Sequence, residues 1–448
     1  MSRRVRSVAI TATISLALAG CGGVGGGDDG DDAAGKGAIT TLGFSLPDEI
    51  ATTRVDTFKK AHPDIQVTIT EGAFDEQQFL SAVASGNPPD LVYMNRKLVG
   101  TYAKQGSVLP LDDCIATQHI NMAQYRPAAK DEVTLAGKVY GIPEFYSVRV
   151  VYMNEKILRE AGLSPDDIDL ADWAALPALN AKLAKVQGGK VSRIGIDPKL
   201  PEFLPMWAKA NGADLISADG RTAHLDDPKV AEALQTGLSL IDAQGGWGNF
   251  KAFRDTFDFF GAQSPVAKNQ IAVWPMEDWF LNVAARETPD AEVAVRPFVD
   301  RAGNPLTFAS GSAWVIPKGA KNPDAACTFA KTMTATDTWV AAAKARVDQR
   351  KADNEAFTGL YTANVDADKR IFAELYKPSG NKRFDDAVQT ILSVQDKGFS
   401  LPASPAGAEF DKAWYDAANR ALSGQGDAST ALRRGQQEAA SALAKAAG

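Results

Sequence analysis

The stretch that decides the fold is residues 137–154, GKVYGIPEFYSVRVVYMN. Its first part is a short β-prone run that ends at Pro143, because proline has no N–H group to donate to a strand ladder. A second β-prone run follows at 148–153, and Asn154 is in position to cap a helix that begins with EKIL. Two strands joined through a proline predict a segment that passes from one lobe to another. Ligand sites and hinges are commonly found at such segments.

Strand and helix patterns alternate ahead of this segment, through residues 38–143. The β-prone runs, each followed by a helical pattern, are 38–44, 65–69 and 90–94. This order predicts a parallel sheet with helices on both faces, whose binding residues follow the carboxyl ends of the strands. A different α/β set follows at 144–290, β-prone runs return at 293–316, and the remainder is mainly helical. We therefore predict two interleaved α/β lobes.

Composition excludes several classes of function. The chain has 448 residues and a formal net charge of −7, and beyond its first twenty residues it contains no basic run, so nucleic-acid binding is not expected. Its three histidines are scattered, and no metal-ligand spacing is present. The sequence contains neither a Gly-x-Ser-x-Gly motif nor a Ser-His-Asp order, so no catalytic residue, metal or cofactor is predicted.

The N-terminus has the features of an export signal. A basic segment at 2–6 precedes the apolar run 8–19, which is shorter than the roughly 20 residues that span a bilayer. Residues 18–21, LAGC, resemble a bacterial lipobox, in which Cys21 would be acylated and would become the first residue of the mature protein. We predict a lipoprotein signal peptide at 1–20 and a flexible Gly/Asp tether at 21–37. The body would then be lipid-anchored at the extracytoplasmic face of the cell membrane.

Two further cysteines, Cys114 and Cys327, would lie in an oxidising compartment. They form either a disulfide or two buried thiols, and the sequence leaves both alternatives open.

Several motifs along the chain, in order, resemble the family 1 (sugar-type, maltose-binding-like) extracellular solute-binding lipoproteins of ABC transporters. Besides the lipobox and the central stretch, they are SAVASGNPPDLVYMN at 81–95, YAKQGSVLPLDD at 102–113, NQIAVWPMEDWF at 269–280 and GSAWVIPKGAKNPDAACTFAKTM at 311–333. The resemblance implies a type II periplasmic-binding-protein-like α/β fold, with two lobes joined by crossover hinge segments. The expected N-terminal lobe is 38–143 plus 297–330, and the expected C-terminal lobe is 144–296 plus 331–448.

The resemblance also implies a ligand cleft between the lobes. Carried over motif by motif, its substrate-binding residues would be Phe44, Ser45, Asp48, Asn95, Arg96, Glu144, Phe145, Tyr146, Trp279, Ser310, Gly311, Arg350 and Trp414. Arg350 is expected in a loop, VDQRK, and Trp247 is added because it lies in the glycine-rich segment GGWG. Carboxylates, amides and guanidinium groups pair with sugar hydroxyls, and aromatic rings stack on the C–H faces of sugars. Only one of Phe145 and Tyr146 is expected to face the cleft, because neighbours on an extended chain point to opposite sides.

Three functions remain open from the sequence. The leading hypothesis is a monomeric receptor that binds a mono- or oligosaccharide and delivers it to the transmembrane permease subunits of an ABC importer. The second is the same type of receptor for an anionic or amino-containing small solute, which Arg149 and Arg350 would favour. The third is a secreted glycoside-acting enzyme with two carboxylates at hydrolytic spacing.

Overall fold

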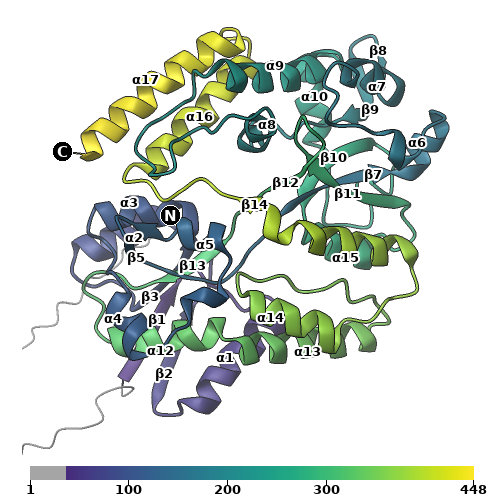
Figure 1. Ribbon diagram of the computed structural model, residues 1–448. Helices are drawn as coiled ribbons and strands as arrows, with labels where there is room; N and C mark the ends of the chain where they lie inside the picture. The colour runs from purple at the N-terminus through teal and green to yellow at the C-terminus, as the bar shows by residue number, and fades with distance from the viewer. Residues whose placement is uncertain (1–36, 448) are drawn as a thin grey trace, which may run out of the picture. The chain divides into compact units, whose positions relative to one another are not determined.

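The computed structural model describes residues 37–447 (Figure 1). The predicted signal peptide, Cys21 and all of the predicted tether except Gly37 lie outside the described residues. Within the described chain, no helix is both long enough and apolar enough to cross a membrane. The same residues contain no group of three or more histidine, cysteine, aspartate or glutamate side chains arranged to hold a metal ion.

The first half of the fold is built on a five-stranded sheet. In sheet order its strands are β2 (Ile65–Thr70), β1 (Gly37–Leu42), β3 (Leu91–Asn95), β13 (Ser312–Val315) and β6 (Ile142–Pro143). Strands β1, β2 and β3 are parallel, as the alternation of strands and helices predicts. β13 is antiparallel to both of its neighbours, and it comes from a distant part of the chain.

Helices flank this sheet, and their ends follow the sequence signals. They are α1 (Glu49–Ala61), α2 (Glu76–Ala84), α3 (Val99–Lys104), α4 (Asp112–Thr117), α5 (Pro127–Asp131), α12 (Pro323–Thr334), α13 (Thr336–Ala352) and α14 (Val365–Arg370). Asp48 caps α1 by accepting a hydrogen bond from the Ala51 N–H at 3.0 Å. Asp75 caps α2 in the same way, through the Gln78 N–H at 2.8 Å. A small hairpin of β4 (Thr134–Leu135) and β5 (Lys138–Val139) precedes β6.

The second half is built on a seven-stranded sheet with β7 (Arg149–Asn154) at its centre. In sheet order its strands are β14 (Gly398–Phe399), β12 (Pro305–Phe308), β11 (Val293–Val299), β7, β10 (Ile271–Glu277), β9 (Lys190–Ile196) and β8 (Lys185–Gln187). All six residues of β7 are buried, as expected for a strand covered on both faces. Asn154 accepts a hydrogen bond from the Ile157 N–H at 3.1 Å and so caps the next helix, as predicted.

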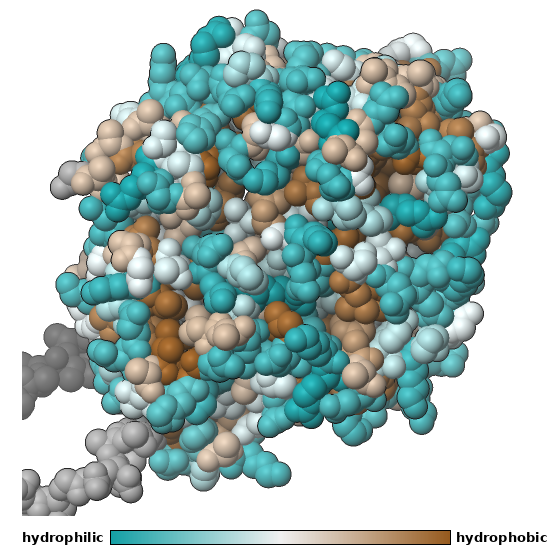
Figure 2. All heavy atoms as spheres, in the orientation of Figure 1, coloured by the Kyte–Doolittle hydropathy of each residue, from teal (hydrophilic) through white to brown (hydrophobic). Residues whose placement is uncertain are grey.

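The remaining helices follow in chain order. They are α6 (Glu155–Glu160), α7 (Leu176–Leu183), α8 (Leu204–Ala210), α9 (Pro228–Asp242), α10 (Gly246–Arg254), α11 (Phe280–Glu287), α15 (Lys382–Val394), α16 (Gly407–Leu422) and α17 (Ala428–Ala447). Figure 2 shows that the face in view is mostly hydrophilic, and that hydrophobic side chains gather in its hollows.

Three segments run side by side between the two sheets. Residues 144–148 lead from β6 to β7, and the Ser147 N–H donates to the Ser310 carbonyl at 2.9 Å. The Ala363 N–H donates to the Glu144 carbonyl at 3.0 Å, which adds residues 361–364 on the other side. Residues 144–148, which belong to the stretch 137–154, therefore form the middle one of the three segments.

Three elements depart from the expected division into lobes. β12, expected with the N-terminal lobe, pairs with β11 and β14 in the seven-stranded sheet. α13, expected with the C-terminal lobe, packs on α1 and α12 beside the five-stranded sheet, and α14, expected with the same lobe, packs on α13 (Figure 1). Propensity and periodicity indicate the type of an element, but they do not indicate which sheet it will join.

The two cysteines left open by the sequence form a disulfide. Cys114 on α4 and Cys327 on α12 are bonded, with their Cα atoms 5.9 Å apart. The bond ties an early helix of the first half to a helix that is 213 residues later in the chain.

Candidate functional site

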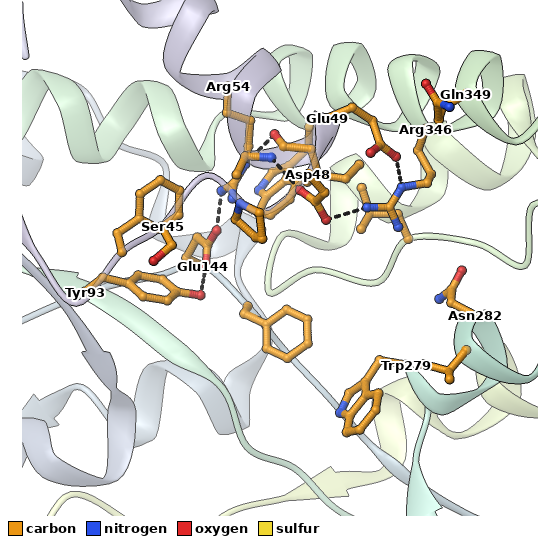
Figure 3. A pocket seen from close by; sticks show the side chains of 18 of the residues that line it. Ser45, Asp48, Glu49, Arg54, Tyr93, Glu144, Trp279, Asn282, Arg346 and Gln349 are labelled. Atoms are coloured by element: carbon orange, nitrogen blue, oxygen red, sulfur yellow. Dashed lines mark hydrogen bonds and ion pairs between the residues drawn. The ribbon is translucent and has the colours of Figure 1, made fainter. Parts of the chain in front are cut away.

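A cavity of about 950 Å³ lies between elements of both halves (Figure 3). We call it the first cavity. Its walls come from the β1–α1 connection, β3, the crossover at 144–145, α11 and α13. Seven of the predicted site residues line it, namely Phe44, Ser45, Asp48, Glu144, Phe145, Trp279 and Arg350.

Glu144 lies at the floor of the first cavity and is almost completely buried. One of its carboxylate oxygens is paired with the Arg54 guanidinium, and the other accepts a hydrogen bond from the Tyr93 hydroxyl. Arg54 also lies over the Trp339 ring, 4.1 Å from its centroid. Burial and the adjacent Glu144 carboxylate raise the pKa of Tyr93 well above its usual value. This network fixes the crossover to α1 and β3, and it occupies both carboxylate oxygens.

The arginines at the rim of the first cavity are also paired with carboxylates. Arg346 on α13 pairs with Asp48, at 2.6 Å, and with Glu49. Arg350 pairs with Glu355. The expected loop around Arg350 is wrong, because VDQRK is part of α13. The lining residues therefore carry no arginine without an ion-pair partner, since Arg54 and Arg286 are paired as well.

Trp279 projects into the first cavity from the start of α11, and Asn282 follows it on the next turn (Figure 3). The preceding residue, Asp278, is buried and accepts hydrogen bonds from the Ser147 hydroxyl at 2.8 Å and from the Trp279 N–H at 2.8 Å. It also accepts bonds from the Val148 N–H and the Gln395 amide, at 3.3 and 3.2 Å. Burial raises the pKa of Asp278 to about 6. Asp278 thus ties the base of Trp279 to the central crossover.

A second cavity, of about 450 Å³, shares no lining residue with the first. Three other predicted residues line it, namely Asn95, Ser310 and Trp414. The Trp414 ring is buried and its N–H donates to Asp411 at 3.1 Å, whereas the neighbouring Tyr415 is 38% exposed. The predicted site residues are therefore divided between two cavities.

The floor of the second cavity also holds a buried ion pair. Arg96 Nε donates to Glu132 at 2.8 Å, and a second Arg96 N–H donates to the Phe145 carbonyl. Burial raises the pKa of Glu132 in spite of this pair. Arg149, which also lines the second cavity, donates to the Phe308 carbonyl at 2.9 Å and lies 3.4 Å from Glu277. Arg149 is thus ion-paired, and burial lowers the pKa of its guanidinium.

Four predicted residues line neither cavity. Arg96 and Tyr146 are buried, so Phe145 and Tyr146 diverge as their alternation predicts. The Gly311 carbonyl accepts a hydrogen bond from the Arg96 N–H at 3.0 Å. Trp247 lies in helix α10 rather than in a loop, with its ring stacked on Phe250. The glycines before Trp247 mark the start of that helix, which explains the wrong expectation.

The sequence analysis missed several lining residues. They are Arg54, Tyr93, Asn282, Trp339 and Arg346. Arg54 carries a signal that could have been used, because it falls among the apolar positions of α1, where an unpaired charge would be unfavourable. The sequence around Arg346 contains no such signal, because polar and apolar residues are mixed on all sides of α13.

Comparison with known proteins identifies the family. A family model described as bacterial extracellular solute-binding protein matches residues 53–348. The arabinooligosaccharide-binding protein of Bacillus subtilis is 22% identical over 335 residues, covering 70% of this chain and 72% of that protein. A maltooligosaccharide ABC transporter solute-binding lipoprotein of Streptococcus pneumoniae is 24% identical over 361 residues, covering 75% of this chain and 78% of that protein.

Solved structures show the same fold. CpMnBP1 with mannobiose bound has a TM-score of 0.70 and 24% identity, covering 90% of this chain and 99% of that one. Lmo0181 from Listeria monocytogenes, in complex with cycloalternan, has a TM-score of 0.71 and 20% identity, covering 91% of this chain and 99% of that one. The two-lobe α/β fold implied by the sequence is thereby confirmed, and the family match spans most of the chain. The protein belongs to the family of bacterial extracellular solute-binding proteins.

Proposed function

We propose that this protein is the receptor of an ABC importer and that it binds a carbohydrate in the first cavity. The observation that carries the proposal is the half-buried Trp279 ring, which faces a cavity whose lining carries four arginines and four carboxylates, with every one of those arginines ion-paired. A cavity with internally balanced charge favours a neutral ligand over an ionic one. Relatives and structural neighbours whose names or titles specify saccharides support the same ligand class.

The chemistry of the lining suits a sugar. The indole of Trp279 offers a flat apolar face to the C–H groups of a pyranose ring. Ser45 and Asn282, together with the free lone pairs of Asp48, can exchange hydrogen bonds with its hydroxyls. Because a desolvated polar site rejects a ligand that lacks one hydroxyl, this arrangement would discriminate between related sugars.

The alternative cargo, an anionic or amino-containing solute, gains no support from the two arginines that suggested it. Arg149 and Arg350 each have a carboxylate partner already.

The mechanism we propose is hinge closure. Ligand in the first cavity would contact Trp279 and Asn282 from the second half and Ser45 and Asp48 from the first half. Such a ligand stabilises the closed arrangement only to the extent that it binds that arrangement more tightly. The closed monomer would then present its surface to the permease subunits, and it would be held at the membrane by a lipid on Cys21.

The lipid anchor has its own test. The substitution Cys21→Ser is expected to release the protein from the membrane fraction and to abolish incorporation of labelled palmitate. Retention of both would overturn the anchor.

A thermal-shift screen tests the ligand class. The panel would contain mannobiose, maltotriose and arabinobiose as neutral sugars, with glucose 6-phosphate, glutamate and lysine as charged solutes. We expect at least one neutral saccharide to raise the melting temperature and the charged solutes to have no effect. A shift with charged solutes alone would replace the carbohydrate proposal by the alternative cargo, and hydrolysis of a bound saccharide would replace the receptor by an enzyme.

A further inference from the structure

Phe260 has an exposed aromatic ring that the proposed site does not use. The ring is 61% exposed, which is high for a large hydrophobic side chain in the described part of the molecule. A single exposed phenylalanine needs no explanation by itself. Phe260 needs one because its ring is stacked on Trp279.

The stack is nearly parallel. The two ring centroids are 5.7 Å apart and the planes differ by 4°, which is the offset arrangement that aromatic pairs prefer. Trp279 lines the first cavity but Phe260 does not. Phe260 therefore contacts the indole from outside the set of residues that line the cavity.

The segment that carries Phe260 is held by contacts at and just before this residue. Residues 255–270 connect α10 to β10, and connections longer than about 12–15 residues are uncommon unless they have a function. The Phe259 ring packs edge-on against Phe280 with centroids 5.8 Å apart. The Phe260 N–H donates to the Asp258 carboxylate at 2.9 Å. These contacts hold Phe260 over the indole.

The backbone and the ring of Trp279 are held by different groups. Its N–H is bonded to Asp278, but within residues 37–447 its indole has Phe260 as its one aromatic neighbour and no hydrogen bond to its N–H. Besides the core residues on which Trp279 packs, the phenyl ring is therefore the aromatic group that can set the angle of the indole.

We propose that Phe260 is a positioning residue that holds the indole of Trp279 at the angle at which its cavity side stacks on a sugar ring. The effect on binding rests on the proposed carbohydrate function, whereas the effect on the indole does not. The experiment therefore has two arms, and the first needs no ligand.

The first arm measures the indole in the unliganded protein. The tryptophans are labelled with 5-fluorotryptophan, and the ¹⁹F resonance of Trp279 is assigned by its loss in Trp279→Ala. Phe260→Ala is expected to shift and narrow that resonance alone, whereas Phe260→Tyr, which keeps the ring, and the exposed control Val186→Ala leave it unchanged. Because Phe260 is mostly exposed, its substitution should leave the melting temperature almost unchanged. An unchanged Trp279 resonance in Phe260→Ala overturns the proposal.

The second arm measures affinity for mannobiose, maltotriose and arabinobiose by calorimetry. For whichever of these saccharides binds wild type, Phe260→Ala is expected to lower the affinity by about 2- to 10-fold, the effect of losing one aromatic pair. Phe260→Tyr, which keeps the ring, should have the wild-type affinity. In a Trp279→Ala background the same substitution should have no effect, because its action passes through the indole. An equal loss in both backgrounds would make Phe260 a direct ligand contact and overturn the positioning role. If no saccharide binds, the proposed function fails, while the ¹⁹F arm still decides the role of Phe260.

Discussion

The two cavities have floors of the same kind and differ in how completely their polar groups are paired. Each floor holds a buried arginine–glutamate pair, Arg54–Glu144 in the first and Arg96–Glu132 in the second. In the first, both carboxylate oxygens have partners, and the ring that faces the open space is Trp279. In the second, Arg96 Nη2 has no hydrogen-bond partner among the described residues, and the Trp414 ring is buried.

This difference separates two uses of a buried charge. A fully paired network in a low-dielectric interior is rigid, and it can hold a backbone segment in one place. An incompletely paired one leaves a donor that water or a ligand can satisfy. The paired network at the floor of the first cavity thus supports the crossover rigidly beneath an aromatic binding face. The following predictions test this difference between the two cavities.

The largest effect is expected from Glu144→Ala. Removing this carboxylate leaves Arg54 buried without a counter-charge, which typically costs about 3–5 kcal/mol. Urea unfolding measures the loss, with Glu49→Ala at the rim as the control, expected to cost under about 1 kcal/mol. Equal small losses in the two variants would mean that Glu144 does not support the crossover.

As the pH rises, the free energy of unfolding of Asp278→Asn should increase relative to that of wild type, by up to about 3 kcal/mol. The pKa of Asp278 is about 6 in the folded protein and lies near 3.8 when unfolded. As the pH rises from about 4 to about 7, the unfolded state ionises first, so wild type loses stability relative to Asp278→Asn over this interval. The difference levels off above about pH 7, where the folded state is ionised as well. A stability difference that does not vary between pH 4 and 7 would show that the Asp278 pKa is not raised.

Trp279→Ala should weaken saccharide binding by about 30-fold, equivalent to about 2 kcal/mol for an anchoring aromatic residue. The matched variant in the second cavity is Tyr415→Ala, which is expected to leave the affinity unchanged. Calorimetry with the saccharide selected by the thermal screen measures both. The reverse pattern would move the site to the second cavity.

The smallest effect is expected from Arg346→Ala at the rim of the first cavity. Its pairs with Asp48 and Glu49 are partly exposed, so their loss should cost at most about 1 kcal/mol. Salt screens such pairs, and the difference from wild type should shrink between 0.05 and 1 M NaCl. A cost that does not vary with salt would point to packing of the arginine side chain rather than to its charge.

Local signals in the sequence predict the fold well. The cap residues Asp48, Asp75 and Asn154 mark helix starts that the structure contains, and the alternation of elements predicts the parallel core of the first sheet. Local signals do not predict that β12 joins the second sheet, because strand pairing is decided by contacts between distant residues.

The site could be predicted only in part for the same reason. Trp279 and Phe145 lie where the motifs place them, at the first cavity. Arg96 and Tyr146 are in the expected segments, but their side chains are buried in ion-pair and core contacts. Whether a polar side chain faces a cavity or a buried partner depends on a residue that is far away in the sequence, as Glu132 is for Arg96.

The position of β13 has a consequence for biosynthesis. Strands β7, β9, β10 and β11 of the second sheet have all been made once residue 299 is added to the chain. The first sheet needs β13, at 312–315, between β3 and β6, although β1, β2 and β3 were made first. Strands β3 and β6 therefore have unpaired edges until the ribosome has passed residue 315. The disulfide forms later still, because Cys114 has no partner until Cys327 has been added to the chain. The half of the protein that starts the chain cannot be finished until most of the other half has been synthesised.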